Sequence, residues 1–557
     1  MPTRSITRSL AACVIVLAVA FPLSAQRGGR GADVPMSLDA TADRVFAQFN
    51  STHSPGCAVG VAQNAKPILM RGYGMADLES NVPITATTIL ESGSVAKQFT
   101  STAVALLMKD GKINIDDPVR KYIPELPEYP RPLLVRHLLS HTSGLREWSN
   151  LVAFAGWPRG TRLHTQADLL EAAVAQKSLN YPVGDFYSYT NTGFALLVTI
   201  VERVSGMPFA QFSEERIFKP LGLTNTHWRD DFTTIIPGRA QAYGRRGGES
   251  TAWALDMPND NIHGPGGLLT TVGDWLKWND HLDKKTLGSQ VVDSLTKQAV
   301  LTSGRTISYA RGLIVAKYRG IDEISHSGST SGYSTYLARY PGKNLSVAVM
   351  CNAAGAPATA FAHGLIDALV PDLVPVVAPD TVTTDAAAAA KLAGIYRSTR
   401  THEPVIVGGA GRGGRGGVRA LRDGAWLVGN NRATFETAPD GSPRGMRVVG
   451  ADNDTTAYLF AGAAPWTPTP DQLTPFAGRY RSDEVNSTWT VKIENGKLMT
   501  YVRSGMKAEL TPIYADAFNA GGGIGGVIWF TRDAKGAVTA MHSGSARVWD
   551  FVLTREK

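Results

Sequence analysis

A serine and a lysine three positions apart are the residues whose types and spacing best fit covalent chemistry. Ser94 and Lys97 lie in the segment 91–111, where apolar residues such as Phe99 recur at helical spacing up to Gly111. Residues i and i+3 of a helix are neighbours, so the lysine amine can reach the serine hydroxyl. A lysine buried beside the positive end of a helix dipole also loses its proton readily. The pair is therefore a candidate nucleophile with its base.

Two other segments, 294–297 and 504–507, share this Ser-x-x-Lys spacing, so context has to choose among them. The second contains Gly505 and has strand-like surroundings, which argues against a helix. The first lies in a polar helical stretch and is typical of a solvated face. Only Ser94 opens a long apolar helix after a Ser-Gly turn, so we predict that it is the nucleophile.

A second candidate pair is Tyr189-Thr-Asn191, the only Tyr-x-Asn in the chain. It precedes the apolar helical run 194–204, so both side chains can project from a loop into a cleft. A phenol can relay the serine proton or protonate a leaving group, and an amide can hold a lysine or a substrate carbonyl. The alternative is a buried tyrosine beside an asparagine that caps the helix.

A third candidate segment is His326-Ser-Gly328-Ser329, on a predicted strand. A glycine in a strand leaves room for a substrate backbone to approach closely. The similar segment 542–545 belongs to a repeat in the C-terminal part of the chain. We therefore expect it to be poorly placed to face Ser94.

The order of predicted elements indicates an α+β fold, with strands at both ends of a helical middle. We predict that residues 37–378 form a mixed sheet built from both ends, with a helical subdomain beside it and the site in the cleft between them. The predicted elements are a helix in 37–50, strands at 57–63 and 67–74, the Ser94 helix, a helical region at 112–240, a helix through Trp275 and Trp278, strands at 324–327, 333–340 and 345–351, and a helix in 352–378.

A shift in composition marks the end of this domain. Residues 379–391 contain five consecutive alanines and indicate a short helical linker. The chain beyond is strand-rich and repeats itself, because Ala-Gly-x-Tyr-Arg-Ser occurs at 393–398 and again at 477–482. We predict two small antiparallel β-barrel-like modules, 392–470 and 471–557.

Composition and charge bound the classes of function. The chain has 557 residues, of which 43% are hydrophobic, so it is globular and long enough for more than one domain. The net charge of +8 is not concentrated on any predicted helix, and we expect the Gly/Arg tract 408–417 to be a surface loop. We therefore predict no nucleic-acid partner. No group of cysteines and histidines has metal-ligand spacing, so we also predict no metal and no other cofactor.

Residues 1–25 have the three parts of an export signal: basic residues, an apolar run and small residues before a cleavage site. The run is too short for a stable membrane span, although an uncleaved anchor is the alternative. We predict a periplasmic or extracellular protein with a Gly/Arg spacer at 26–36. An oxidising compartment permits a disulfide between Cys57 and Cys351, but two buried, unpaired thiols are the favoured interpretation.

Taken in order, the Ser94, Tyr189 and His326 motifs resemble those of the serine β-lactamase and penicillin-recognising family. The branch in question is that of class C β-lactamases, D,D-carboxypeptidases and D-aminopeptidases. The resemblance covers about residues 37–370. The C-terminal modules resemble the lipocalin-like barrels appended to D-aminopeptidases.

The resemblance implies an acyl-enzyme mechanism. Ser94 would attack a carbonyl, while Lys97 and Tyr189 would share the duties of base and proton relay. The backbone N–H groups of Ser94 and Ser329 would form the oxyanion hole. Whether the lysine or the tyrosine is the acylation base stays open.

The other motif residues, Asn191, His326 and Gly328, are implied to bind substrate. Class C β-lactamases have a lysine where this chain has His326. Histidine is only partly charged near neutral pH, so it would hold a substrate carboxylate less permanently. This difference favours a peptidase, amidase or esterase over an efficient β-lactamase.

We therefore predict an exported serine hydrolase that acts through an acyl-enzyme on peptide-like amides, of the D-amino-acid peptidase or carboxypeptidase type. Its expected partners are small molecules and short peptides, with cell-wall fragments as candidates. An esterase or β-lactamase on the same fold is one alternative. A penicillin-binding sensor protein with little turnover is another alternative. The presence of Ser94, Lys97 and Tyr189 argues against it.

Overall fold

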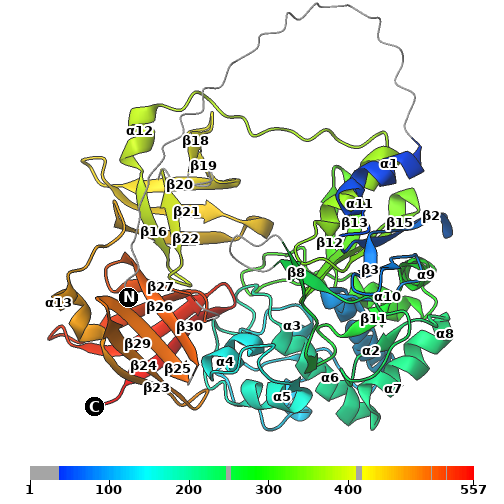
Figure 1. The fold of residues 1–557 in the computed structure, drawn as a ribbon, viewed down its shortest axis with the longest axis horizontal. Coiled ribbons are helices and arrows are strands. Elements are labelled where there is room, and N and C mark those ends of the chain that lie inside the picture. Colours follow the sequence, from blue (N-terminus) through cyan, green and yellow to red (C-terminus); the bar gives the residue numbers. More distant parts are fainter. Residues whose placement is uncertain (1–36, 246–251, 409–416, 504, 522–523) are drawn as a thin grey trace, which may run out of the picture. The chain divides into compact units, whose positions relative to one another are not determined.

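The computed structural model describes residues 37–245, 252–408, 417–503, 505–521 and 524–557 (Figure 1). The predicted export signal, its spacer, most of the Gly/Arg tract and Ser504 of the third Ser-x-x-Lys segment lie outside the described residues. The domain boundaries drawn from the sequence stay predictions.

The first domain is organised around a six-stranded sheet drawn from both ends of the domain, as predicted. Its strand order is β12-β13-β14-β15-β1-β2. All its neighbouring pairs are antiparallel. Short turns join the consecutive strands from β12 to β15, and another joins β1 to β2, whereas parallel pairs need long crossovers. Parallel pairing occurs in a separate small pair, β6 (His164–Thr165) with β10 (Asp260–Asn261). The six strands are β1 (Cys57–Gln63), β2 (Lys66–Tyr73), β12 (Ile314–Tyr318), β13 (Ile321–Thr330), β14 (Tyr333–Tyr340) and β15 (Leu345–Cys351).

Helices cover both faces of this sheet, which explains why the central strands are apolar on both sides. On one face Phe46 and Leu365 share a core cluster with Val59 of β1. On the other face Trp275 packs in a cluster with Ala58. Ala58 is the neighbour of Val59 in β1, so its side chain points to the opposite face of the sheet. The covering helices are α1 (Leu38–Val45) and α11 (Ala358–Leu369) on the first face and α9 (Val272–Asp283) on the second.

The predicted helical subdomain is centred on α2 and α6, which pack against each other. Every residue of α2 from Lys97 to Leu107 is buried, as its apolar spacing predicted. The helices of this region are α2 (Lys97–Lys109), α3 (Val135–Leu139), α4 (Trp148–Phe154), α5 (Gln166–Val174), α6 (Asn191–Ser205), α7 (Phe209–Ser213), α8 (Lys219–Leu221) and α10 (Ser289–Leu295). Its short strands are β3 (Met75–Asp77), β4 (Val82–Pro83), β5 (Leu90–Glu91), β6 (His164–Thr165), β7 (His227–Trp228), β8 (Tyr243–Arg245), β9 (Trp253–Leu255), β10 (Asp260–Asn261) and β11 (Leu268–Thr270).

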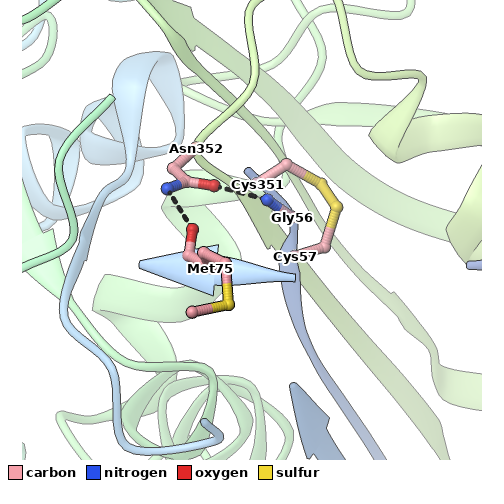
Figure 2. Close-up of a disulfide and its surroundings, with 5 residues drawn as sticks. All are labelled: Gly56, Cys57, Met75, Cys351 and Asn352. Atoms are coloured by element: carbon pink, nitrogen blue, oxygen red, sulfur yellow. Dashed lines mark hydrogen bonds between the residues drawn. A yellow bond between two sulfur atoms is a disulfide. The ribbon is translucent and has the colours of Figure 1, made fainter. Parts of the chain in front are cut away.

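Cys57 and Cys351 form a disulfide, which corrects the preference for two unpaired thiols (Figure 2). The two residues lie directly opposite each other in the antiparallel pair of β1 and β15, with Cα atoms 4.0 Å apart. Asn352 follows directly in the chain. Its Oδ1 accepts a hydrogen bond from Gly56 N, and its Nδ2 donates one to the Met75 carbonyl O. The sequence could not show this pairing, because it depends on the register between strands 294 residues apart.

The C-terminal part contains two antiparallel β modules that differ in closure. The second is a closed eight-stranded barrel, and the first is an open seven-stranded sheet. The sheet contains β16 (Gly394–Ser398), β17 (Pro404–Val407), β18 (Val418–Ala420), β19 (Trp426–Val428), β20 (Asn431–Thr437), β21 (Pro443–Val449) and β22 (Thr455–Gly462), after the linker helix α12 (Ala386–Lys391). The barrel contains β23 (Gly478–Ser482), β24 (Ser487–Glu494), β25 (Lys497–Arg503), β26 (Met506–Tyr514), β27 (Ala517–Ala520), β28 (Val527–Arg532), β29 (Val538–Ser545) and β30 (Val548–Arg555), after α13 (Pro470–Leu473).

The barrel shares a core with the helical subdomain. Leu151 and Phe154 of α4 belong to the barrel's own hydrophobic cluster, and Trp489 Nε1 donates to the Phe154 carbonyl O at 2.9 Å. Arg146 forms an ion pair with Glu484 of the barrel at 3.3 Å. The barrel is therefore fixed against the domain that carries Ser94.

None of the described helices is by itself both long and apolar enough to cross a membrane. Length and composition alone would admit one pair, Asn191–Ser205 with Phe209–Leu221, which is bent by 81°. The first helix of that pair is α6, most of which is buried in the core.

Candidate active site

Ser94 lies in a single 3-10 turn, Gly93–Ala96, directly before α2, rather than in the first turn of the helix itself. Lys97 is the first residue of α2, so the i, i+3 relation still brings the two side chains together. The turn is possible because Gly93 adopts φ +52°, a conformation that favours glycine. A Cβ there would lie 2.6 Å from the backbone nitrogen of Ser329.

The Lys97 amine is buried among hydrogen-bond acceptors. Its Nζ lies 3.0 Å from Ser94 Oγ and donates to Asn191 Oδ1 at 2.8 Å and to the Pro265 carbonyl O at 2.7 Å. Burial lowers the pKa of Lys97 well below its usual value, against the opposing effect of Glu147. A neutral amine can satisfy both carbonyls with its N–H groups and direct its lone pair at the Ser94 hydroxyl.

Tyr189 completes the group around the nucleophile. Its Oη donates to Ser94 Oγ at 2.7 Å, and its ring lies 4.8 Å from Lys97 Nζ. The His141 ring supports it from a centroid distance of 4.1 Å. Burial raises the pKa of Tyr189 and lowers the pKa of Lys97, so the phenol holds its proton more firmly than usual while the amine gives its proton up more readily. This arrangement suits Lys97 as the proton acceptor and Tyr189 as the relay.

Asn191 begins α6 and holds the lysine from that helix terminus. Thr190, not Asn191, is the capping residue, since its hydroxyl accepts from Thr192 N. The fully buried carboxylate of Glu147 accepts from Asn191 N at 2.6 Å and from its Nδ2 at 3.2 Å. Glu147 therefore fixes the amide so that its oxygen faces Lys97, a role that no motif in the sequence indicated.

Strand β13 lies directly against the turn that carries the nucleophile. A Cβ at Gly328 would lie 2.1 Å from the Ser92 carbonyl O and 3.1 Å from Ser94 N. The glycine thus admits the enzyme's own turn, whereas we had expected it to admit a substrate backbone. Ser329 lines the same pocket as Ser94, so the proposed pair of oxyanion N–H groups comes from neighbouring segments.

His326 lies in this pocket but differs from the expected partly charged residue. Its Nδ1 lies 2.6 Å from the Ser327 carbonyl O and its Nε2 3.1 Å from Tyr309 Oη. Burial, with the nearby Lys97, lowers the pKa of His326 to about 3. A neutral ring that donates through Nδ1 and accepts from Tyr309 fits these contacts, so His326 carries no charge at neutral pH.

A cavity of about 830 Å³ opens at Ser94 and is lined by Tyr189, His326 and Ser329. It is also lined by Arg547 of the barrel, whose guanidinium carbon lies 5.0 Å from the centroid of the Tyr189 ring. Sequence reasoning missed this residue, because the fold joins segments more than 350 positions apart. The segment 542–545 itself stays outside the cavity, with His542 bonded to Asp550.

The remaining Ser-x-x-Lys segment that the structure describes does not form a comparable group. Ser294 lies on α10 and accepts a hydrogen bond from Arg311, which is part of no catalytic arrangement. Within the described ranges, no cluster of three or more His, Cys, Asp or Glu residues is suited to hold a metal ion.

The arrangement can perform nucleophilic acyl transfer. The Ser94 hydroxyl contacts an amine whose pKa is lowered and a phenol whose pKa is raised, and two backbone segments meet where an oxyanion would form. The structure thus brings together Ser94, Lys97, Tyr189 and Asn191, with His326 and the β13 backbone around the same cavity. The chemical roles of these residues stay predictions.

Comparison with known proteins gives related sequences along most of the chain. The D-aminopeptidase of Brucella anthropi is 26% identical over 537 residues, which cover 91% of this chain and 97% of that protein. Penicillin-binding protein 4* of Bacillus subtilis is 27% identical over 316 residues, or 53% of this chain and 66% of that protein. The D-aminopeptidase of Gluconobacter oxydans is 27% identical, over 60% of this chain and 62% of that protein. The chain thus spans slightly less than two thirds of the length of the last two relatives.

Solved structures share the fold. An octameric penicillin-binding protein homologue from Pyrococcus abyssi has a TM-score of 0.54 at 22% identity, covering 84% of this chain and 98% of that one. The D-amino acid amidase from Ochrobactrum anthropi SV3, complexed with L-phenylalanine amide, has a TM-score of 0.50 at 21% identity, covering 60% and 96%. Residues 42–370, more than half of the chain, match the Beta-lactamase family model, and the chain belongs to that family.

Proposed function

We propose that the protein is an exported serine hydrolase that cleaves peptide-like amides through an acyl-enzyme. The observation that carries the proposal is the position of Ser94 Oγ, 3.0 Å from Lys97 Nζ and 2.7 Å from Tyr189 Oη. The D-aminopeptidase relatives support a D-amino acid next to the bond that is cleaved. The sequence of residues 1–25 supports export, which N-terminal sequencing of the mature protein would test.

In the proposed reaction Ser94 Oγ attacks the substrate carbonyl carbon while its proton passes to Lys97 Nζ. The N–H groups of Ser94 and Ser329 stabilise the oxyanion of the tetrahedral intermediate. Tyr189 relays the proton to the leaving nitrogen as the C–N bond breaks, which releases the amine and leaves the acyl group on Ser94. Water then attacks the ester with the same base, releases the carboxylic acid and restores the serine hydroxyl.

The test is a substrate panel of p-nitrophenyl esters, N-acetylated D-amino acid and L-amino acid anilides, and nitrocefin, measured on wild type and Ser94→Ala. We expect anilide turnover in the wild type and its loss in Ser94→Ala. Ser294→Ala, which changes the serine of the same spacing on α10, is the matched control and should keep full activity. Turnover that survives Ser94→Ala would overturn the proposal.

The panel also separates the alternatives. Ester turnover without anilide turnover would make the protein an esterase, and nitrocefin turnover would make it a β-lactamase. Covalent mass added to Ser94 by penicillin or a fluorophosphonate, without turnover of any substrate, would make it a binding protein.

A further inference from the structure

The turn between β29 and β30 of the barrel reaches the catalytic cavity. Ser545 pairs with Val548, so Ala546 and Arg547 form the two-residue turn of the hairpin. The guanidinium of Arg547 lies over the Tyr189 ring at 5.0 Å and lines the cavity that contains Ser94. A module outside the catalytic domain therefore contributes a side chain to the site.

This turn is fixed in place by the catalytic domain. The Asn180 side chain makes two hydrogen bonds here. Its Nδ2 donates to the Arg547 carbonyl O at 3.0 Å, and its Oδ1 accepts from the backbone N of Trp549, just after the turn, at 3.0 Å. Glu147 N donates to the same carbonyl at 3.4 Å, and Ser188 Oγ donates to the Ala546 carbonyl O at 3.4 Å. These contacts hold the backbone of the turn against the catalytic domain, and the Tyr189 ring is the contact of the guanidinium itself.

Arg547 also brings an uncompensated charge. No carboxylate among the described residues forms an ion pair with its guanidinium, and no described Asp or Glu lines the 830 Å³ cavity. His326, the residue that the sequence suggested for carboxylate binding, is neutral, because its pKa is lowered to about 3. An anion in this cavity would therefore meet Arg547 as its fixed positive partner.

A positively charged substrate amine finds no comparable partner. The carboxylates of the adjoining pocket at Ser94 belong to Glu91 and Asp260. Arg229 pairs with both, at 3.2 Å and 3.1 Å, and Arg159 pairs with Asp260 at 2.5 Å. Both carboxylates are thus already paired, so among the described residues the two pockets at Ser94 offer no unpaired acid to a substrate ammonium group.

The position of Arg547 specifies which part of the substrate carries the anion. In the proposed reaction Tyr189 passes a proton to the leaving nitrogen, so the leaving group lies beside Tyr189. The guanidinium that stacks on Tyr189 is therefore adjacent to the leaving group rather than to the acyl group on Ser94. An amino acid that leaves with a free α-carboxylate meets this requirement.

We propose that Arg547 binds the carboxylate of the leaving amino acid, so that the enzyme prefers peptides with a free C-terminus and acts as a carboxypeptidase rather than an aminopeptidase. The proposal rests on the proposed function for the reaction, and it adds the substrate class. It assigns to the barrel a direct part in specificity.

The test compares N-acetylated alanine dipeptides of D and L configuration, each as the free acid and as the C-terminal carboxamide, with the unblocked dipeptide amide. We expect the wild type to prefer the acid over the amide in kcat/KM. Arg547→Gln should lower that ratio by about 10- to 100-fold, as expected for the loss of a charge-assisted hydrogen bond. Arg547→Lys should keep part of the preference. Lys535→Gln removes an equal charge from the exposed β28–β29 turn of the same barrel and should leave the ratio unchanged.

Binding measured on inactive protein separates this proposal from the proposed function. Calorimetric titration of Ser94→Ala should give tighter binding of the acid than of the amide, and Ser94→Ala/Arg547→Gln should abolish the difference. An acid-to-amide ratio that Arg547→Gln leaves unchanged would overturn the proposal, as would preference for the unblocked amide or equal activation of both substrates by the substitution. Turnover that survives Ser94→Ala would instead count against the serine mechanism and leave the binding result to decide the role of Arg547.

Discussion

Lys97 is the residue on which the proposed reaction depends, and its surroundings balance two opposed effects. Burial and the positive charge of Arg547 lower the pKa of Lys97, whereas the carboxylate of Glu147 raises it. Glu147 also holds Asn191, which accepts from the amine. The same buried acid therefore tunes the proton affinity of the base and orients its partner.

Glu147→Gln should move the acid limb of the kcat/KM profile to lower pH. The base must be neutral to act, so activity is lost as the pH falls through the pKa of Lys97. Removing the negative charge lowers that pKa further, and activity then persists to a lower pH. We also expect kcat to fall about tenfold, because a charge-assisted bond to Asn191 is weakened.

The measurement is kcat/KM for an uncharged ester from pH 4 to 9, with Glu171→Gln on the exposed face of α5 as the control. An acid limb that stays in place would show that Glu147 does not act on Lys97.

His326 predicts how stability depends on pH. Its pKa is lowered from 6.5 to about 3 in the folded protein, so the unfolded chain binds more protons between these values. Stability is then fully present above about pH 6.5 and decreases as the pH falls toward 3, by about 1.4 kcal/mol per pH unit for this residue. His326→Gln cannot titrate, so between pH 7 and pH 5 it should lose about 2 kcal/mol less than the wild type in urea unfolding. Equal losses in the two proteins would show that the ring is not held neutral.

At the scale of elements, the approach of β13 to the Ser94 turn sets the geometry of the site. Gly328→Ala should displace that turn, because the new Cβ would lie 2.1 Å from the Ser92 carbonyl O. Displacements of about 1 Å at a reacting group cost on the order of 100-fold in rate, so we expect at least that loss in kcat. The free energy of unfolding should fall by about 1 to 3 kcal/mol because of the crowding.

Gly342→Ala is the control, since a Cβ there has no atom within 4 Å. Full activity in Gly328→Ala would mean that the turn tolerates the shift.

The elements that the sequence predicted correctly are those with a strong local pattern. The apolar spacing of α2, the strands β14 and β15 and the hairpin of β1 and β2 all appear at the predicted places, to within one residue for the strands. Ser94 falls in a 3-10 turn rather than in α2 because Gly93 must turn past Ser329, a contact that local spacing does not encode. The disulfide likewise depends on the long-range register of β1 with β15.

The candidate site follows the same division. Ser94, Lys97, Tyr189 and Asn191 could be proposed because short motifs carry them in order. Glu147, Tyr309 and Arg547 could not, because each acts through one side chain placed by tertiary contacts. The neutral state of His326 also required the structure, since it results from burial rather than from residue type.

At the scale of the whole molecule, the barrel and the helical subdomain share a hydrophobic cluster. Residues 38–557 form a single compact unit. Phe154 of α4 inserts between Trp489 and Phe551 of the barrel, with ring centroids 5.7 Å and 4.6 Å away. The ion pair of Arg146 with Glu484 is nearly buried, and the guanidinium also donates to the Asp550 carbonyl O. Loss of the barrel would therefore disturb Glu147, which directly precedes α4, and Tyr189, which lies shortly before α6.

Phe154→Ala should separate the unfolding of the barrel from that of the catalytic domain. The side chain is 1% exposed, and removing a buried aromatic ring costs about 3 to 5 kcal/mol. In the wild type we expect loss of the proposed hydrolase activity and change in tryptophan fluorescence to coincide during urea unfolding, because the shared core couples the two parts. In the variant the two transitions should separate, and activity should be lost at the lower urea concentration, since the contacts of Asn180 with the Arg547 turn no longer hold. Phe232→Ala, at a position 37% exposed, should leave both transitions together. Coincident transitions in Phe154→Ala would show that the barrel is coupled to the site by the polar contacts alone.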